Sequence, residues 1–205
     1  MAMSYRSELR SYYEAEAAQR LRGPLHGLRL EWRAAFTDVL RGEQRTSVVD
    51  FGAGPGRDVA AFNDAGLEAI GLDLAVGNAR LAHEAGMHVV PADVARPPVR
   101  PRTFEAAWSM STLMHLDDDE TLDALGAMGH TTVPGSPMVV GVWGGDDVLR
   151  FDAAIEGERR PFYRRSVSSN QTLFSQVATV ESVEEFDLGS SGYQLFHLRS
   201  KAAET

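Results

Sequence analysis

Short apolar runs alternate with amphipathic stretches over most of the chain. Five runs of mostly small or β-branched apolar residues are typical of buried strands and lie at about 48–51, 69–73, 87–93, 104–108 and 138–143. The spacing of apolar residues after several of these runs predicts helices at about 58–65, 78–85 and 117–130. Strands that alternate with helices in this order predict an α/β domain with a largely parallel sheet.

The C-terminal third departs from this alternation. Residues 144–170 show little periodicity, so we expect a long segment without regular structure. A last helix is expected at about 170–177, and two strands at about 179–188 and 193–200 flank a turn of glycine and serine. Residues 171–205 are therefore expected to hold the last helix and a hairpin.

A glycine-rich turn follows the first strand. From Asp50 the chain reads Asp-Phe-Gly-Ala-Gly-Pro-Gly, so glycine recurs at 52, 54 and 56. Glycine lets the backbone approach a ligand closely, and the start of the next helix offers unpaired N–H groups to a polar ligand. A dinucleotide fingerprint G-x-G-x-x-G from Gly52 would need glycine at 57, where the chain has Arg57.

Two further strands end in an aspartate. Asp73 lies 21 residues after Gly52, a spacing at which a carboxylate can accept hydrogen bonds from ribose hydroxyls. An ordinary loop carboxylate is the alternative for Asp73. Asp93 closes the third strand. Because the carboxyl ends of parallel strands face a ligand crevice, we expect the turn and both acids at one site.

The D-x-G-x-G-x-G pattern and the two later acids resemble the class I methyltransferases that use S-adenosylmethionine. The resemblance implies a Rossmann-like α/β three-layer sandwich, whose seven-stranded, mostly parallel sheet has one antiparallel strand in a C-terminal hairpin. It also implies S-adenosylmethionine as cofactor, S-adenosylhomocysteine as product and a carboxylate at 93 that faces the adenine amino group. The expected cofactor-binding residues are Asp50, Gly52, Ala53, Gly54, Gly56, Asp73, Leu74, Asp93, Val94, Ser109 and Met110.

The segment after the fourth strand narrows the class of acceptor. Family members that methylate nucleic-acid bases or glutamine often carry an Asn/Asp-Pro-Pro-aromatic box here, and this chain has none. The segment instead resembles bacterial small-molecule methyltransferases, in which a strand ending in tryptophan leads to Leu-x-His-Leu, here Leu113–Leu116. Over residues 48–116 the resemblance is specific.

His115 is the first candidate for a general base. Histidine accepts a proton near neutral pH, and His115 follows a strand whose end should face the cofactor. A structural role in packing or capping is the alternative, and a neutral amine acceptor would need no base. Tyr13 and His26, from the N-terminal helices, are the reserve candidates.

Two amphipathic helices are expected before the first strand. The first runs from Ser4 to Gly23, and Gly42 ends the second, which should pack on the sheet. Packing explains the three tyrosines on one face of the first helix, but in small methyltransferases that resemble this chain such a helix covers the cofactor. We therefore interpret residues 1–42 as an N-terminal helical lid and residues 43–143 as the cofactor-binding core.

Residues 144–170 are interpreted as a substrate lid. They contain Arg159, Arg160, Arg164 and Arg165 around two aromatic residues. Arginine holds carboxylates and phosphates through forked hydrogen bonds, so these four are candidate substrate-binding residues. A solvated loop is the alternative.

Composition limits the partners. The 205 residues suit one domain, and 29 acidic against 20 basic residues give a net charge of −9, which disfavours nucleic acid. Without cysteine the chain has no thiolate metal site, and we expect no metal. The acidic run Asp117–Glu120 is better explained as a helix start, because consecutive residues cannot converge on one ion.

No N-terminal signal and no 18-residue apolar run is present, so we expect a cytoplasmic protein without membrane contact. A monomer or a homodimer is expected. Frequent alanine, glycine and arginine, with only one lysine, hint at a GC-rich bacterial source.

The function expected from these features is methyl transfer from S-adenosylmethionine to oxygen or nitrogen of a small molecule, of the kind found in specialised metabolism. One alternative is a cofactor-binding partner subunit without catalysis. A nicotinamide-dependent or flavin oxidoreductase is the other, and it is disfavoured because Arg57 breaks its fingerprint and Asp93 has no role in that chemistry.

Overall fold

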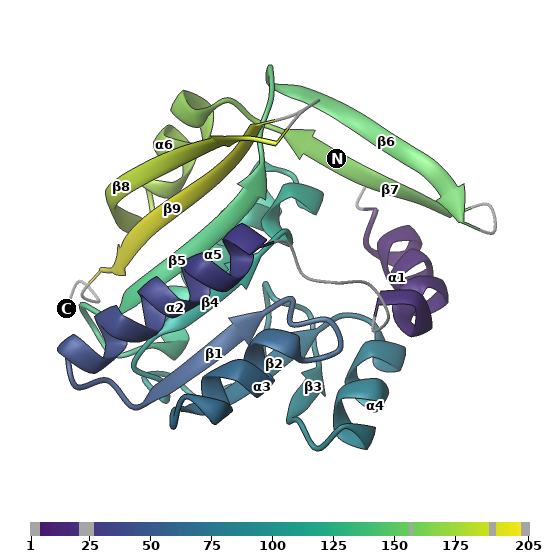
Figure 1. The fold of residues 1–205 in the computed structure, drawn as a ribbon. Coiled ribbons are helices and arrows are strands. Elements are labelled where there is room, and N and C mark those ends of the chain that lie inside the picture. Colours follow the sequence, from purple (N-terminus) through teal and green to yellow (C-terminus); the bar gives the residue numbers. More distant parts are fainter. Residues whose placement is uncertain (1–4, 21–26, 156–157, 189–191, 202–205) are drawn as a thin grey trace.

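Seven strands form one sheet, which the computed structural model shows for the described residues 5–20, 27–155, 158–188 and 192–201. The strands are β1 (Ser47–Phe51), β2 (Glu68–Asp73), β3 (Val89–Pro91), β4 (Ala107–Met110), β5 (Pro137–Trp143), β8 (Ala178–Asp187) and β9 (Gly192–Ser200). Their spatial order is β3-β2-β1-β4-β5-β9-β8 (Figure 1). Strands β1 to β5 pair in parallel, whereas β9 runs antiparallel to both β5 and β8.

Helices cover both faces of this sheet (Figure 1). One face carries α2 (Gly27–Gly42), α3 (Arg57–Asp64) and α4 (Val76–Glu84), and the other carries α5 (Asp118–Thr131) and α6 (Val167–Phe174). Val48 packs on the face that carries α2, α3 and α4, and Val49 packs on the face that carries α5 and α6. Both side chains are fully buried. A strand covered on both faces needs apolar residues at successive positions, which explains the continuous runs in the sequence. The predicted three-layer fold is confirmed.

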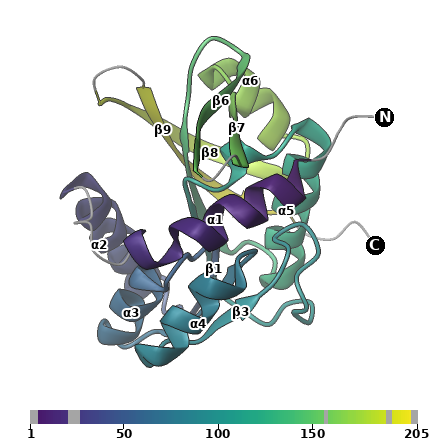
Figure 2. The ribbon, with the colours of Figure 1, turned by 90° about the vertical axis from the view of Figure 1, so that its right-hand side faces the viewer.

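Helix α1 (Arg6–Arg20) and a two-stranded hairpin lie outside these layers. Helix α1 runs past the edge where β2, β3 and β4 end, in contact with α4 (Figure 2). Strands β6 (Val148–Ile155) and β7 (Glu158–Arg164) pair with each other as a separate antiparallel hairpin, and β7 contacts α1.

The expectation of an irregular segment at 144–170 was wrong. The β6–β7 hairpin fills most of it, and α6 begins at Val167 rather than near Asn170, because the Ser166 side chain accepts the N–H of Ser169 as an N-cap. The hydrophobic pattern of the sequence does not predict this hairpin, because the hairpin lies outside the main sheet. Leu149 and Phe151 remain exposed, so no regular alternation of buried apolar and exposed polar residues develops.

Other element boundaries shift by a few residues. The fourth strand begins at Ala107, since Phe104 forms only an isolated bridge to Thr132. The acidic helix start is confirmed: Asp117 and Glu120 form a capping box, in which each side chain accepts the other residue's backbone N–H. Ser4 and Gly23, expected to bound the first helix, lie outside the described residues.

A buried ion cluster fastens α2 to the sheet. The Asp58 side chain is fully buried and accepts hydrogen bonds from Arg29 (2.6 Å), Arg33 (3.1 Å) and the Trp108 indole (2.8 Å). Burial alone would raise the pKa of Asp58, but the charge and hydrogen bonds of Arg29, with Trp108 and Arg33, lower it below the ordinary carboxyl value. The ionised carboxylate thus links α2, α3 and β4.

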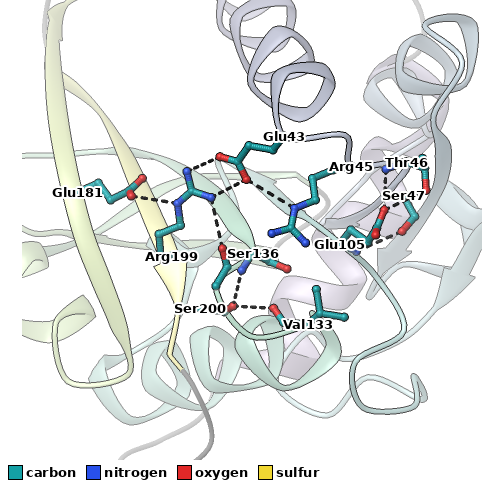
Figure 3. Close-up of polar contacts among 11 residues, drawn as sticks. Glu43, Arg45, Thr46, Ser47, Glu105, Val133, Ser136, Glu181, Arg199 and Ser200 are labelled. Carbon is teal, nitrogen blue, oxygen red and sulfur yellow. Dashed lines mark hydrogen bonds and ion pairs between the residues drawn. The ribbon is translucent and has the colours of Figure 1, made fainter.

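The C-terminal end of α2 is fastened separately. Figure 3 shows the Arg199 guanidinium of β9 between Glu43 and Glu181, with its Nη2 atom 2.5 Å from Glu43 and its Nε atom 2.9 Å from Glu181. The hydrogen bond from Arg199 lowers the pKa of Glu43. These groups are partly exposed, so water screens the pairs and each adds little stability.

Replacing Asp58 tests the buried cluster. We expect Asp58→Asn to lower the free energy of unfolding by about 3 kcal/mol at pH 7, because both guanidinium groups lose their buried counter-ion. The lowered pKa means that this stabilisation is present above the ordinary carboxyl pKa of about 3.9 and is lost as the pH falls through the folded-state value. The difference between the wild type and the variant should therefore shrink at pH 3.

Urea denaturation at both pH values measures this difference. Asp38→Asn is the matched control, because Asp38 pairs with Arg41 on the exposed face of α2. Equal losses in the two variants at pH 7 would show that the buried cluster does not stabilise the fold.

Candidate active site

The turn after β1 is left-handed at three glycines. Gly52, Gly54 and Gly56 have φ angles of 83°, 55° and 82°, which side chains disfavour. Gly52 has a second constraint, because a Cβ atom there would overlap the Thr112 side chain, which lies beyond the end of β4. Gly56 is the N-cap of α3, so the turn passes directly into that helix. Only glycine lets β1 and the segment after β4 approach so closely.

Asp73 holds this turn in place. Its Oδ2 atom accepts the backbone N–H of Gly54 (2.7 Å), and its Oδ1 atom accepts the N–H of Ala75 (2.9 Å) and the Asn78 side-chain amide (3.0 Å). These contacts hold the carboxylate at the edge where β1 and β2 end. Asp73 thus positions the turn and still lines the adjacent pocket.

Asp93 meets the N-terminal helix. One carboxylate oxygen accepts the N–H of Ala95 (3.0 Å), and the other pairs with Arg6 of α1. Arg6 also donates its Nε–H to Glu120 at 2.8 Å. The first turn of α1 is therefore held between the third strand's acid and the start of α5.

A pocket lies between these acids, the glycine turn and α1. The space between these groups amounts to about 640 Å³, a volume that includes open solvent. The predicted residues Gly52, Asp73, Leu74, Asp93, Val94 and Met110 line it, together with Arg6, Leu9, Tyr13, Asn78, Ser111, Thr112, His115 and Leu116. The other predicted residues, Asp50, Ala53, Gly54, Gly56 and Ser109, lie outside this lining.

Asp50 lies behind the glycine turn rather than in the pocket. Among the described residues, neither of its buried carboxylate oxygens has a hydrogen-bond partner. Burial raises the pKa of Asp50 well above its ordinary value, and the charges of Asp58 and Asp73 act in the same direction. The Asp50 carboxyl group is therefore harder to ionise than an exposed one.

Three predicted residues meet at the other end of the pocket. His115 closes the short 3₁₀ helix η1 (Leu113–His115) and is 4% exposed. Its Nε2 atom lies 2.7 Å from the Tyr13 hydroxyl, and its Nδ1 atom lies 2.7 Å from the Pro161 carbonyl oxygen. Arg160 of β7 donates to the same hydroxyl at 3.5 Å and lies over the Tyr13 ring. Helix α1, η1 and the hairpin thus assemble one cluster.

The remaining arginines of the hairpin are placed elsewhere. Arg165 is buried and donates to Asp118 (2.8 Å) and to the Leu116 carbonyl (2.9 Å), which joins the end of β7 to the start of α5. Arg164 and Arg165 line a separate groove with Asp118 and Asp147. The side chain of Arg159 and all of His26 lie outside the described residues.

Several lining residues were not predicted. Asn78 could have been found, because it follows Asp73 by five residues and falls in the first turn of α4. Arg6 and Thr112 carried no local signal, since they meet the site only through the tertiary fold. Among the described residues, no group of three or more His, Asp or Glu side chains could hold a metal ion. None of the described helices is long and apolar enough to cross a membrane.

Comparison with known proteins identifies related chains. Residues 48–135 match a family model described as a methyltransferase domain. The malonyl-[acyl-carrier protein] O-methyltransferase of Pseudescherichia vulneris is 38% identical over 80 residues, which are 38% of this chain and 32% of that protein. The match therefore spans about a third of the curated relative's length.

Two solved structures share the fold over nearly the whole chain. The Burkholderia thailandensis 1,6-didemethyltoxoflavin-N1-methyltransferase, with its substrate and S-adenosylhomocysteine bound, has a TM-score of 0.74 at 20% identity and covers 98% of this chain and 92% of its own. A DhpI complex with S-adenosylhomocysteine has a TM-score of 0.74 at 16% identity and covers 98% of this chain and 99% of its own. At these identities the likeness shows the fold.

The close approach at Gly52 generates a stability prediction. Gly86→Ala should cost about 1 kcal/mol, because Gly86 has a φ of 84° but open space around a new Cβ. Gly52→Ala has the same backbone strain and must also displace Thr112, so we expect it to cost roughly 1–3 kcal/mol more. Adding Thr112→Ala to Gly52→Ala should recover part of that excess. Equal losses for the two glycine variants in urea denaturation would contradict the close contact.

Proposed function

We propose that this chain, whose residues 48–135 match a methyltransferase-domain model, is a class I S-adenosylmethionine-dependent methyltransferase that transfers a methyl group to oxygen or nitrogen of a small molecule. One observation carries the proposal. A single pocket joins the glycine turn and two strand-end carboxylates to a tyrosine–histidine pair at its other end.

The residues present suit an adenosyl group. Gly52 lets the ligand approach the backbone, and the Asp73 carboxylate lines the pocket, where it would accept a ribose hydroxyl. Leu74 and Val94 line the pocket together with Asp93, and their apolar side chains would suit an adenine ring. For Asp93 to accept the adenine amino group, Arg6 would share that carboxylate or remain with Glu120 alone.

The protein's contribution to the reaction is mainly geometric. When bound, S-adenosylmethionine supplies a methyl group that its sulfonium already activates. The chain must hold the acceptor in line with that methyl and exclude water. Helix α1 lines the pocket and the β6–β7 hairpin packs against α1 and η1, so we propose both as lids, and residues 1–205 as one domain.

A small-molecule acceptor is favoured by the net charge of −9, by the lack of an Asn/Asp-Pro-Pro-aromatic box after β4 and by the relatives. The Burkholderia enzyme is named as an N1-methyltransferase of 1,6-didemethyltoxoflavin, and the Pseudescherichia enzyme as an O-methyltransferase of malonyl-[acyl-carrier protein]. We therefore keep both oxygen and nitrogen as target atoms. A cytoplasmic location and a monomeric or homodimeric state also remain predictions.

The cofactor site is tested by removing Asp73. A lost hydrogen bond to a carboxylate is worth about 1.5–3 kcal/mol, so Asp73→Ala should weaken S-adenosylhomocysteine binding at least about tenfold in calorimetry. Asp64→Ala, at the exposed end of α3, is the control and should bind like the wild type. Unchanged affinity in a folded Asp73→Ala protein would remove Asp73 from the site.

A substrate screen tests transfer itself. We expect labelled methyl from S-adenosylmethionine to appear on at least one member of a panel of small hydroxyl and nitrogen compounds. Tight S-adenosylhomocysteine binding without transfer to any compound would favour the cofactor-binding subunit. Protection from melting by a nicotinamide cofactor but not by S-adenosylhomocysteine would favour the oxidoreductase.

A further inference from the structure

We propose that Tyr13, rather than His115, is the group that takes the acceptor's proton, and that His115 receives the Tyr13 proton in turn. The inference deepens the proposed function, on which it rests. It follows from three contacts that join α1, η1 and β7, elements that are far apart in the sequence.

The tautomer of His115 is fixed by the hairpin. The Pro161 carbonyl oxygen can only accept a hydrogen bond, so the Nδ1 atom that lies 2.7 Å from it must carry the ring proton. In the neutral ring Nε2 is then an acceptor, and the Tyr13 hydroxyl at 2.7 Å must be its donor. The direction of the Tyr13–His115 hydrogen bond is therefore determined.

His115 and Tyr13 differ in how far they are buried. His115 is 4% exposed, and its two nitrogens point to Tyr13 and to Pro161. Phe162 packs edge-on against the imidazole at 4.7 Å, which holds the ring plane. Tyr13 is only partly buried and lines the pocket. His115 also lines the pocket, but its Nε2 atom is already engaged by the Tyr13 hydroxyl, 2.7 Å away.

Arg160 adds charge stabilisation at the phenol oxygen. Its guanidinium carbon lies 4.7 Å from the Phe162 ring centre and 4.8 Å from that of Tyr12, which fixes the side chain between two aromatic rings. Its Nη1 atom lies 3.5 Å from the Tyr13 oxygen, at the long end of the hydrogen-bond range. Negative charge that develops on this oxygen during proton transfer therefore faces a fixed cation. Arg160 is a positioning residue and is not required to bind substrate.

The proton steps balance without an oxidant or reductant. The acceptor's electron pair forms the new bond to the methyl carbon as the sulfur–methyl bond breaks and its electron pair stays on sulfur. The acceptor's proton goes to the Tyr13 oxygen while the Tyr13 proton goes to His115 Nε2. His115 becomes an imidazolium, whose Nδ1–H still donates to Pro161. The positive charge of the sulfonium is thus replaced by that of His115.

We call the transfer of the acceptor's proton to Tyr13, and of the Tyr13 proton to His115, the relay. The relay also limits which chemical groups can be the acceptor. An amine that binds as the free base needs no proton acceptor before methylation. A hydroxyl or a ring N–H must lose its proton as the methyl arrives. We therefore infer that the acceptor carries such a proton, as an alcohol, a phenol or an N–H heterocycle does.

The first test needs no acceptor. In full-length protein labelled with ¹⁵N-histidine and saturated with S-adenosylhomocysteine, long-range ¹H–¹⁵N spectra distinguish the two neutral tautomers, and His115→Gln identifies the His115 signals. We expect the Nδ1–H tautomer, and in Tyr13→Phe we expect the Nε2 signal to move toward that of an imidazole nitrogen without a donor. Tyr163→Phe, which removes a hydroxyl from the β6–β7 hairpin but not from the cluster of Tyr13, His115 and Arg160, should leave the His115 Nε2 signal unchanged.

An Nε2–H tautomer in the wild type, or an Nε2 signal that Tyr13→Phe does not move, would overturn the relay. Both results are independent of whether any acceptor is found. Failure of the proposed function looks different, because it appears as a lack of S-adenosylhomocysteine binding or as a lack of methyl transfer to any compound, and not as a changed tautomer.

The second test uses an acceptor from the methyl-transfer screen. Tyr13→Phe and His115→Gln should each lower kcat about 10²–10⁴-fold, with S-adenosylhomocysteine affinity within about twofold of the wild type. The double variant should be no slower than the slower single variant, because the two groups act as one unit. Losses that multiply, or a Tyr13→Phe protein with wild-type kcat, would contradict the relay.

Discussion

Parallel pairing of β1 with both β2 and β4 is the constraint on which the site depends. In this pairing Asp50 lies beside Gly71 on β2 and Trp108 on β4, so the three strands end at the same edge. The glycine turn, Asp73 and the segment from Met110 onward then lie within contact distance of one another. The pocket exists because three strand ends coincide, and the left-handed turn at Gly52 is what allows Thr112 to close against it.

The other side of the pocket is held by weaker forces. Among the described residues of α1, Leu9, Tyr12 and Ala17 are buried apolar residues, whereas its polar contacts reach the pocket walls. Glu14 accepts the N–H of Gly77 at the start of α4, 2.9 Å away, and Arg6 pairs with Asp93. A helix held by a few polar contacts opens at lower free energy than a core helix does. A cover of this kind suits a pocket that must admit a cofactor and release a product.

Much of this organisation could be predicted from the sequence. The seven strands of the main sheet, the three layers and the acidic start of α5 depend on local patterns, and they are confirmed. The pocket positions of Gly52, Asp73 and Asp93 followed from spacing, because each lies at a strand end. Contacts between distant segments could not be predicted in the same way.

The Tyr13–His115 pair is the clearest example of such a contact. Each residue could be selected by its chemistry, but the hydrogen bond between them spans 102 positions and depends on where α1 lies. The β6–β7 hairpin was missed because it packs against α1 and η1 rather than joining the main sheet. The sequence therefore could not distinguish Arg160 from the other three arginines of this segment. The tertiary fold places Arg160 at the Tyr13 hydroxyl, and Arg164 and Arg165 in a separate groove.

A crystal structure of the protein with S-adenosylhomocysteine bound would test the central claim most directly. The site described here predicts the ribose at Asp73, the adenine between Leu74 and Val94, and the sulfur at the end of the pocket that Tyr13 lines. A ligand bound elsewhere, or one whose sulfur lies at the Asp93 end, would contradict both the cofactor site and the role of the tyrosine–histidine pair.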